Sequence, residues 1–332
     1  MIRLINTILL TIFLSSCQGK NSASREIWIY TSLYKDTIAK LLPMLKRKFP
    51  DVDFKFYQAG SEEIAAKVNA EILTNNLKAD VLISSDRFWY EELADNKALS
   101  PIPEDVWRKI PNDLRHPKKS YVTLSLPVMV LCYNSDTVDK SLVPENFKDL
   151  SHPKYNNLFS TGSPLASGTN FTTMAMLQYN YGWDYFKKLK LNKTIAQGGN
   201  SSVLRRIQSS ERPIGWVLLE NVLRFQKKDP RLKIIYPKDG VVTNNNVLAL
   251  TNKEFSHPKL DEFVRFMFSK NGQELMTDSF MYSPLQEIAA PVGAPSLDFI
   301  LKNSFPWSRK FISRTTVDRL DLKEEYSSIM FQ

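Results

Sequence analysis

Residues 121–133 read YVTLSLPVMVLCY, and this stretch does most to decide the fold. From Val122 to Cys132, apolar side chains alternate with more mixed neighbours, which is the period of a β-strand. The run is long for one strand, and Pro127 in its middle lacks the amide hydrogen that a central sheet position requires. We therefore predict that the chain here passes from one lobe of a two-lobed protein into the other.

The length of the chain also favours two lobes. It has 332 residues, which is more than one hydrophobic core usually organises. A second candidate crossing lies at residues 233–246, where Pro237 and Gly240 follow a short apolar strand pattern. The pattern leaves the placement of residues 291–332 open. The predicted boundaries are residues 26–127 plus 238–332 for a discontinuous first lobe and residues 128–237 for an inserted second lobe.

Strand and helix patterns alternate before the first crossing. Short apolar strands are predicted at residues 27–31, 52–57 and 81–83, and apolar residues at helical spacing lie between them. Strands joined by helices through short connections form a parallel sheet that is covered by helices. The predicted fold class is therefore α/β, in which each lobe has a central, mostly parallel sheet flanked by helices and two crossing strands join the lobes.

The N-terminus has the three parts of an export signal. Arg3 precedes an almost wholly apolar run of about 11 residues, which is too short to span a bilayer because a span takes ~20. Leu14-Ser15-Ser16-Cys17 resembles the lipobox of bacterial lipoproteins. This resemblance implies that residues 1–16 are removed as a signal peptide, that Cys17 is lipidated, and that residues 17–25 form a tether. We predict an exported, membrane-anchored lipoprotein that faces the periplasm or the cell exterior.

Charge and motif content argue against several classes of function. The formal net charge of +9 favours anionic ligands or anionic lipid surfaces. The basic residues are spread along the chain without a nucleic-acid-binding motif, so nucleic acid is not an expected partner. The sequence has no nucleophile elbow, Walker loop or zinc-type histidine spacing, and each of its three histidines precedes a proline, as is typical of turns. We expect a binding protein without a cofactor, not an enzyme.

Several short motifs then match one family in order and spacing. They are Tyr30-Thr31-Ser32, Ala79-Asp80-Val81, Tyr133-Asn134, residues 149–155, Ser167-Gly168-Thr169, residues 236–240 and residues 268–273. In this arrangement the chain resembles the type 2 periplasmic solute-binding proteins of ABC importers, in the branch that includes ferric-ion, phosphonate and sugar-phosphate binders. The resemblance implies a monomer that closes on a small solute by hinge motion and delivers it to a membrane permease with its ATPase.

Two glycine- and hydroxyl-rich stretches predict the ligand contacts of the second lobe. Ligands of such folds lie at the carboxyl ends of strands, and the free amides of a helix N-terminus attract anions. Ser167, Gly168 and Thr169 open one predicted helix. Asn200 and Ser201 follow two glycines and open another. The same residue types also serve as plain helix caps, so that alternative stays open.

Candidate contacts from the first lobe follow its predicted strands. Ser32 comes after the first strand, and Ser84 and Ser85 come after the third. If the sheet is parallel, these positions lie together at the carboxyl edge of its strands, where ligands of such folds bind. A capping role fits each of them equally well.

The ligand itself is predicted as a small anion, namely a phosphorylated, phosphonate or carboxylate compound, and ferric ion is the alternative. Ferric ion prefers carboxylate and phenolate oxygens. The ferric binders of this branch commonly carry adjacent tyrosines late in the second lobe, whereas residues 215–221 here contain Glu220 and no tyrosine pair. Glu220 and Tyr282 are predicted ligand contacts, and a ferric site would use Tyr282, Tyr34 and Tyr30. A lipid-anchored sensor or scaffold is a third hypothesis.

Overall fold

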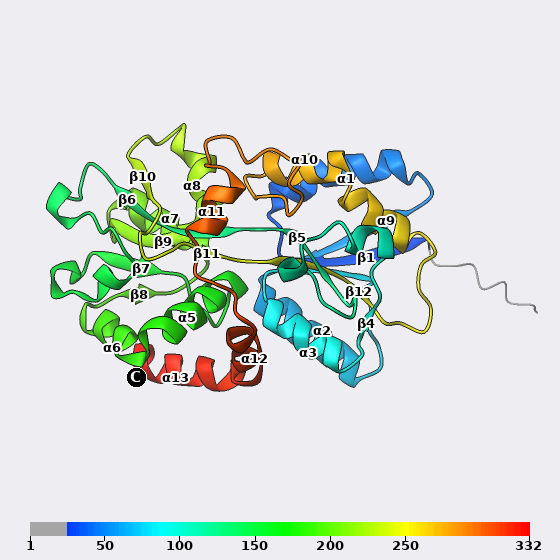
Figure 1. The fold of residues 1–332 in the computed structure, drawn as a ribbon, viewed down its shortest axis with the longest axis horizontal. Helices are drawn as coiled ribbons and strands as arrows, with labels where there is room; N and C mark the ends of the chain where they lie inside the picture. The colour runs from blue at the N-terminus through cyan, green and yellow to red at the C-terminus, as the bar shows by residue number, and fades with distance from the viewer. Residues whose placement is uncertain (1–24) are drawn as a thin grey trace, which may run out of the picture.

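Residues 25–332 are described in the computed structural model and form two lobes that lie side by side (Figure 1). The predicted signal peptide and the predicted lipid site at Cys17 lie outside the described residues. Within residues 25–332, no helix has the length and apolar character needed to cross a membrane.

The first lobe is built on a six-stranded sheet in the order β2-β1-β3-β12-β4, with β5 also paired to β12. Strands β1, β2 and β3 run parallel, and β12 runs antiparallel to its neighbours. The strands are β1 (Glu26–Thr31), β2 (Asp53–Gln58), β3 (Val81–Ser84), β4 (Leu99–Ser100), β5 (Val122–Ser125) and β12 (Asn246–Thr251). The helices are α1 (Lys35–Lys48), α2 (Ser61–Leu73), α3 (Arg87–Asp95), α4 (Glu104–Trp107), α9 (Leu260–Met267) and α10 (Lys270–Asp278).

The second lobe repeats this plan with another six-stranded sheet, in the order β10-β6-β9-β7-β8, and β11 pairs with β6. Strands β7, β8 and β9 run parallel, while β6 is antiparallel to β9 and β10. The strands are β6 (Val128–Asn134), β7 (Phe159–Thr161), β8 (Ile195–Ala196), β9 (Ile214–Leu218), β10 (Leu232–Ile235) and β11 (Val242–Thr243). The helices are α5 (Gly168–Tyr181), α6 (Trp183–Leu191), α7 (Asn200–Ser209) and α8 (Leu219–Gln226).

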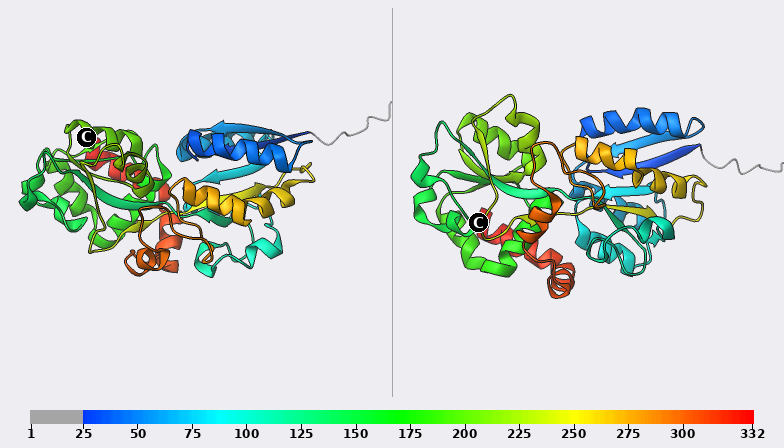
Figure 2. Two further views of the ribbon diagram at one scale, coloured as in Figure 1. Left: turned by 90° about the horizontal axis from the view of Figure 1, so that it is seen from above. Right: turned by 45° about the horizontal axis from the view of Figure 1, so that its top comes forward.

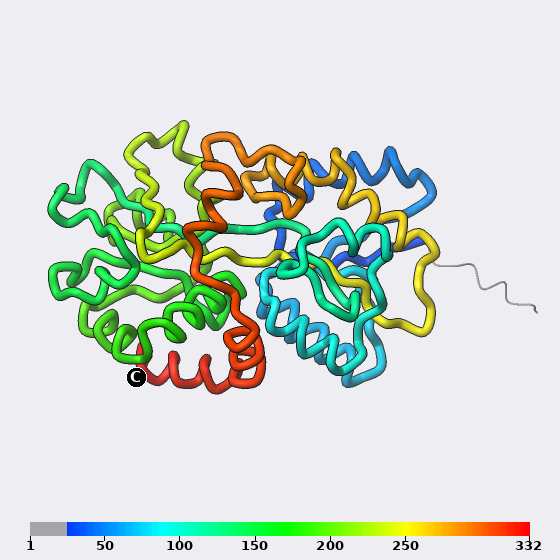
Figure 3. The backbone as a smooth tube through the Cα atoms, in the orientation of Figure 1, coloured from blue at the N-terminus to red at the C-terminus, as the bar shows by residue number. Residues whose placement is uncertain are grey.

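The quoted stretch at residues 121–133 crosses between the lobes, as predicted. It forms two strands, because β5 belongs to the first sheet and β6 to the second, and Pro127 lies between them. The carbonyl oxygen of Pro127 accepts a hydrogen bond from the amide of Asn244, at 2.7 Å, in the returning segment. Figure 3 shows these two segments passing side by side between the lobes. The hydrogen bond ties the two crossings together where the chain changes lobe.

The return crossing lies further along the chain than the predicted boundary at residue 238. The amide of Gly240 bonds to the carbonyl of Pro237 (3.1 Å), which closes a turn that folds the chain back onto the second sheet. As a result β11 pairs antiparallel with β6, and the chain joins the first sheet only at β12. Proline and glycine signalled a turn correctly, but they do not say which sheet receives the strand that follows.

The C-terminal segment also differs from its predicted place in the first lobe. It forms α11 (Leu297–Lys302), α12 (Arg309–Val317) and α13 (Arg319–Phe331). Helix α13 packs on α6, and Tyr326 joins the hydrophobic core of the second lobe beside Phe186. Helix α12 contacts both α3 and α5. Figure 2 shows the red C-terminal helix against the second lobe. The helix lies there because its apolar side chains pack into the core of that lobe.

Candidate functional site

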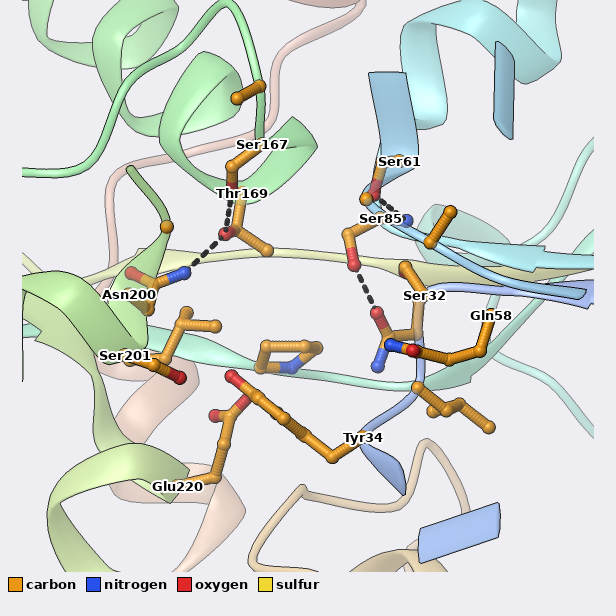
Figure 4. Close-up of a pocket in the computed structure, with 18 of the residues that line it drawn as sticks. Ser32, Tyr34, Gln58, Ser61, Ser85, Ser167, Thr169, Asn200, Ser201 and Glu220 are labelled. Carbon is orange, nitrogen blue, oxygen red and sulfur yellow. Dashed lines mark hydrogen bonds between the residues drawn. The ribbon is translucent and has the colours of Figure 1, made fainter. Parts of the chain in front are cut away.

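A cavity of about 220 Å³ lies between the two lobes (Figure 4). Half of the residues that line it are serine, threonine, asparagine or glutamine. Among residues 25–332, no lysine, arginine or histidine lines it. The lining residues are Ser32, Leu33, Tyr34, Gln58, Ala59, Gly60, Ser61, Ser85, Pro127, Ala166, Ser167, Thr169, Gly199, Asn200, Ser201, Ser202, Leu218, Glu220, Asn246 and Met281.

The first-lobe wall is formed where parallel strands end. Ser32 follows β1, Gln58 ends β2, and Ser85 follows β3, so all three lie at the carboxyl edge of the sheet. Ser61 begins α2, and its hydroxyl oxygen accepts a hydrogen bond from the amide of Ser85 at 3.3 Å. The Ser85 hydroxyl in turn donates to the side-chain oxygen of Asn246. The wall is therefore held by hydrogen bonds among its own polar groups.

The second-lobe wall is formed by the N-termini of α5 and α7. Ser167 caps α5 by accepting a hydrogen bond from the amide of Asn170. The side-chain amide of Asn200, at the start of α7, donates to the Thr169 hydroxyl at 3.0 Å. The Ser167 and Thr169 hydroxyls are 3.1 Å apart. Figure 4 shows these side chains facing Ser32, Ser61 and Ser85 across the cavity.

Glu220 and Tyr34 close the remaining wall and lie beside one another in Figure 4. The Tyr34 hydroxyl donates to the side-chain oxygen of Asn221 at 2.5 Å, which is a contact between the lobes. Glu220 is 1% exposed, and burial raises the pKa of its carboxyl to about 8, although a hydrogen bond from its own backbone amide and the nearby Arg224 guanidinium oppose the rise. Burial, and then the neighbouring Glu220 carboxyl, raise the pKa of Tyr34 well above its ordinary value. Burial therefore favours the neutral form of both groups.

Comparison with known proteins gives the family. A family profile described as bacterial extracellular solute-binding protein matches residues 76–312, which is more than half of the chain. The chain belongs to this family. A curated relative from Haemophilus influenzae, called an uncharacterized protein, is 24% identical over 236 residues, and the match covers 68% of each chain.

Solved structures show the fold of this solute-binding protein. Iron-bound HitA from Pseudomonas aeruginosa has a TM-score of 0.78 at 17% identity, covering 91% of this chain and 99% of HitA. AfuA from Actinobacillus pleuropneumoniae, with fructose-6-phosphate bound, has a TM-score of 0.80 at 19% identity, covering 92% and 99%. The ferric binding protein from Campylobacter jejuni has a TM-score of 0.77 at 18% identity, covering 92% and 100%. The predicted solute-binding family is confirmed by the profile, and the predicted two-lobed periplasmic binding protein fold is confirmed by the solved structures. The sheets are mixed and not mostly parallel as predicted, because β12 and β6 run antiparallel to their neighbours.

Most of the predicted contact residues of the solute-binding protein come together at one cavity. Those that line it are Ser32, Ser85, Ser167, Thr169, Asn200, Ser201 and Glu220. Each sits at a strand end or in the first turn of a helix, which is the rule that selected most of them.

Three predicted contacts lie elsewhere. The Ser84 hydroxyl is 3.1 Å from the Tyr90 hydroxyl inside the first lobe. Successive residues of a strand point to opposite faces of the sheet, so Ser85 points toward the cavity and Ser84 points away from it. The Tyr282 hydroxyl donates to the carbonyl of Pro295 at 2.9 Å, away from the cavity. Gly168 does allow a close backbone approach, but what approaches it is the Ser85 backbone of the opposite lobe.

The predicted ferric set of tyrosines is not brought together. Tyr30 is buried in the first lobe, and its hydroxyl donates to a Glu71 carboxylate oxygen at 2.8 Å. Tyr282 is engaged by Pro295, so Tyr34 is the one member of the set that lines the cavity. Within residues 25–332, no group of three or more histidine, cysteine, aspartate or glutamate side chains is placed to hold a metal ion.

Sequence reasoning missed four polar residues of the cavity, of which Ser202 directly follows the predicted contacts Asn200 and Ser201. Gln58 ends β2, and Ser61 opens the helix after it, so both follow the strand-end rule that selected Ser32. Asn246 opens β12 at the return crossing, and no local pattern marks it as part of a site.

Proposed function

We propose that this solute-binding protein captures a small anionic solute in the interlobe cavity and presents it to an ABC permease. The observation that supports this best is the meeting of three helix N-termini at a cavity that no basic side chain lines within residues 25–332. The helices are α2, α5 and α7, and residues from the start of each one line the cavity.

Helix N-termini hold anions without a basic side chain. Each carries about half a positive charge and free amide donors. Here the hydroxyls of Ser61, Ser167 and Ser201 add further donors beside those amides. The cavity of about 220 Å³ is smaller than the roughly 300–1,000 Å³ of drug-sized pockets, which favours a compact solute such as a phosphorylated, phosphonate or carboxylate compound. The bound fructose-6-phosphate of AfuA is consistent with this class.

The two-lobed architecture supports delivery to a permease. Side chains from both lobes form the cavity, so its shape depends on hinge closure about the crossing strands. Asp36 of α1 pairs with Arg224 of α8 across the lobes, next to the Tyr34–Asn221 hydrogen bond, so these contacts favour the closed form. We expect a monomer that works with a permease and its ATPase. Uptake of labelled solute that is unchanged when the gene for this protein is deleted would favour the sensor or scaffold alternative.

We expect selected anions to raise the melting temperature of the purified protein, because a ligand that binds only the native state stabilises it by mass action. Inorganic phosphate, sulfate, fructose-6-phosphate, a phosphonate, small carboxylates and ferric citrate form the test panel. Thr169→Val removes a cavity hydroxyl at nearly constant size and should weaken binding of the active anion about tenfold. The matched control, Thr74→Val at an exposed position after α2, should leave the affinity unchanged.

Ferric ion is the competing ligand in that panel. Tyr34 and Glu220 offer a phenol and a carboxyl at the cavity, and HitA is an iron-bound structural neighbour. A melting shift with ferric citrate alone, together with a tyrosinate charge-transfer band that Tyr34→Phe abolishes, would contradict the anion proposal.

We also propose that a lipid on Cys17 anchors the protein to a membrane, with residues 17–25 as the tether. The lipobox-like sequence supports this, and the short apolar run before it is too short to span a bilayer. Cys17→Ser should move the protein from the membrane fraction to the soluble fraction and abolish incorporation of labelled palmitate. Replacing the second cysteine, Cys132→Ala, is the control and should leave both unchanged. Retention of the Cys17→Ser protein in the membrane fraction would refute the anchor.

A further inference from the structure

Glu220 is the one acidic side chain among the cavity-lining residues within residues 25–332, and its environment is unusual for a carboxylate. The residue is 1% exposed, and its Oε2 atom has no hydrogen-bond partner in the structure. A buried ionised carboxylate without a partner carries a large desolvation cost, whereas a neutral carboxyl carries a much smaller one. The geometry alone therefore favours a protonated Glu220, in which Oε2 has no hydrogen-bond partner within the protein.

The groups around Glu220 supply little compensating charge. Arg224, one helical turn along α8, is the cation that acts on it, but that guanidinium is already paired with Asp36 and donates to the carbonyl of Ser279 at 3.0 Å. From α1 the facing group is the Tyr34 hydroxyl, which donates to Asn221. The neighbouring helix α7 contributes the uncharged Ser201. The pKa of about 8 is consistent with this arrangement, since burial is its main cause.

We propose that Glu220 contacts the ligand as a neutral carboxyl group and donates a hydrogen bond from that carboxyl to an oxygen of the bound anion. This inference rests on the proposed anion-binding function. An ionised Glu220 would repel an anion in a cavity whose other donors are neutral, whereas the protonated form adds one more donor. Glu220 then selects ligands by chemistry: it favours oxygens that accept hydrogen bonds, and it disfavours ligands whose binding depends on an ion pair between an amine and a carboxylate.

The pH dependence of affinity tests this assignment. Fructose-6-phosphate and sulfate serve as probes between pH 7 and pH 10, because a phosphate monoester has its second pKa near 6 and sulfate keeps its charge throughout. For the wild type we expect a constant Kd below about pH 8 and a rise of about tenfold per pH unit above it. Glu220→Gln keeps a neutral donor at every pH and should show a flat profile, with a Kd at pH 7 that is raised severalfold at most.

Three results would overturn the assignment. A flat wild-type profile would mean that no proton on Glu220 is needed, and a loss of tenfold or more in Glu220→Gln at pH 7 would mean that the ligand needs the ionised carboxylate. Either result would leave anion binding itself intact. Absence of binding by both proteins at every pH would instead refute the proposed function, and this inference with it.

A measurement without ligand provides an independent check. In the folded protein Glu220 keeps its proton up to about pH 8, whereas in the unfolded chain it loses the proton near the ordinary value of 4.5. The folded state therefore binds more protons in this interval, and the free energy of unfolding falls as the pH rises through it. Glu220→Gln should lack this fall, while the exposed control Glu211→Gln should retain it. Equal slopes for Glu220→Gln and the wild type would overturn the neutral carboxyl.

Discussion

Replacing Gly168 with alanine should weaken anion binding by roughly fivefold to a hundredfold, the equivalent of the ~1–3 kcal/mol that overpacking costs. A Cβ atom built at Gly168 would lie 2.8 Å from the carbonyl oxygen of Ser85 and 2.9 Å from its carbonyl carbon. Ser85 belongs to the opposite lobe, and both atoms are backbone, so no rotamer change relieves the clash. The contact relaxes when the lobes part, which disfavours the closed, ligand-binding form.

Gly199→Ala is the matched control for this prediction. Gly199 lines the same cavity at the start of α7, but nothing lies within 4 Å of a Cβ atom built there. Neither Gly168 nor Gly199 has a positive φ, so alanine is acceptable to the backbone at both positions, and both variants keep their amide donors.

Isothermal titration with the anion that binds the wild type measures the difference between the two variants. Small-angle scattering at saturating ligand should also give a larger radius of gyration for Gly168→Ala. Equal affinities for the two variants would contradict the close approach of the lobes.

The sequence predicts the local elements well and the contacts between lobes poorly. The alternation in residues 121–133 predicts a crossing because Pro127 and strand length are local properties. Likewise, Ser32, Ser85 and Thr169 were found because strand ends and helix starts are visible in sequence. The pairing of Tyr34 with Asn221 joins residues far apart in the chain, and no spacing rule encodes it. The sequence therefore predicts which loops form the site, but it does not predict the contacts that hold the two lobes together around it.

The C-terminal helices illustrate the same limit. The sequence of α13 shows that apolar residues such as Leu322 and Tyr326 need a partner, but it does not say which lobe supplies one. In the structure α13 packs on the second lobe, while Arg319 at its start reaches two residues of the first lobe, Glu62 and Asp86. One helix thus connects both lobes beside the N-termini of α2 and α3.

Removing this connection by Arg319→Met should lower the free energy of unfolding by about 3–5 kcal/mol, the usual cost of leaving one member of a buried ion pair alone. The Asp86 side chain is fully buried and also caps α3 by accepting a hydrogen bond from the amide of Trp89. The Arg319 Nε donates to an Asp86 carboxylate oxygen at 2.8 Å, and its Nη2 donates to Glu62 at 3.0 Å. Because Lys323 also pairs with Glu62, Glu62 keeps a partner after the substitution. Asp86 is then the carboxylate that is left without one.

Urea unfolding of three variants separates lost charge balance from lost packing. Arg319→Met with Asp86→Asn should recover most of the stability, because asparagine caps a helix as well as aspartate and brings no buried charge. Arg108→Met breaks an exposed pair with Glu104 on the same lobe as Asp86 and should cost less than about 1 kcal/mol. A double variant no more stable than Arg319→Met would place the effect in the packing of α13 against the first lobe. A loss for Arg319→Met as small as that of Arg108→Met would show that the buried cluster does not join the two lobes in solution.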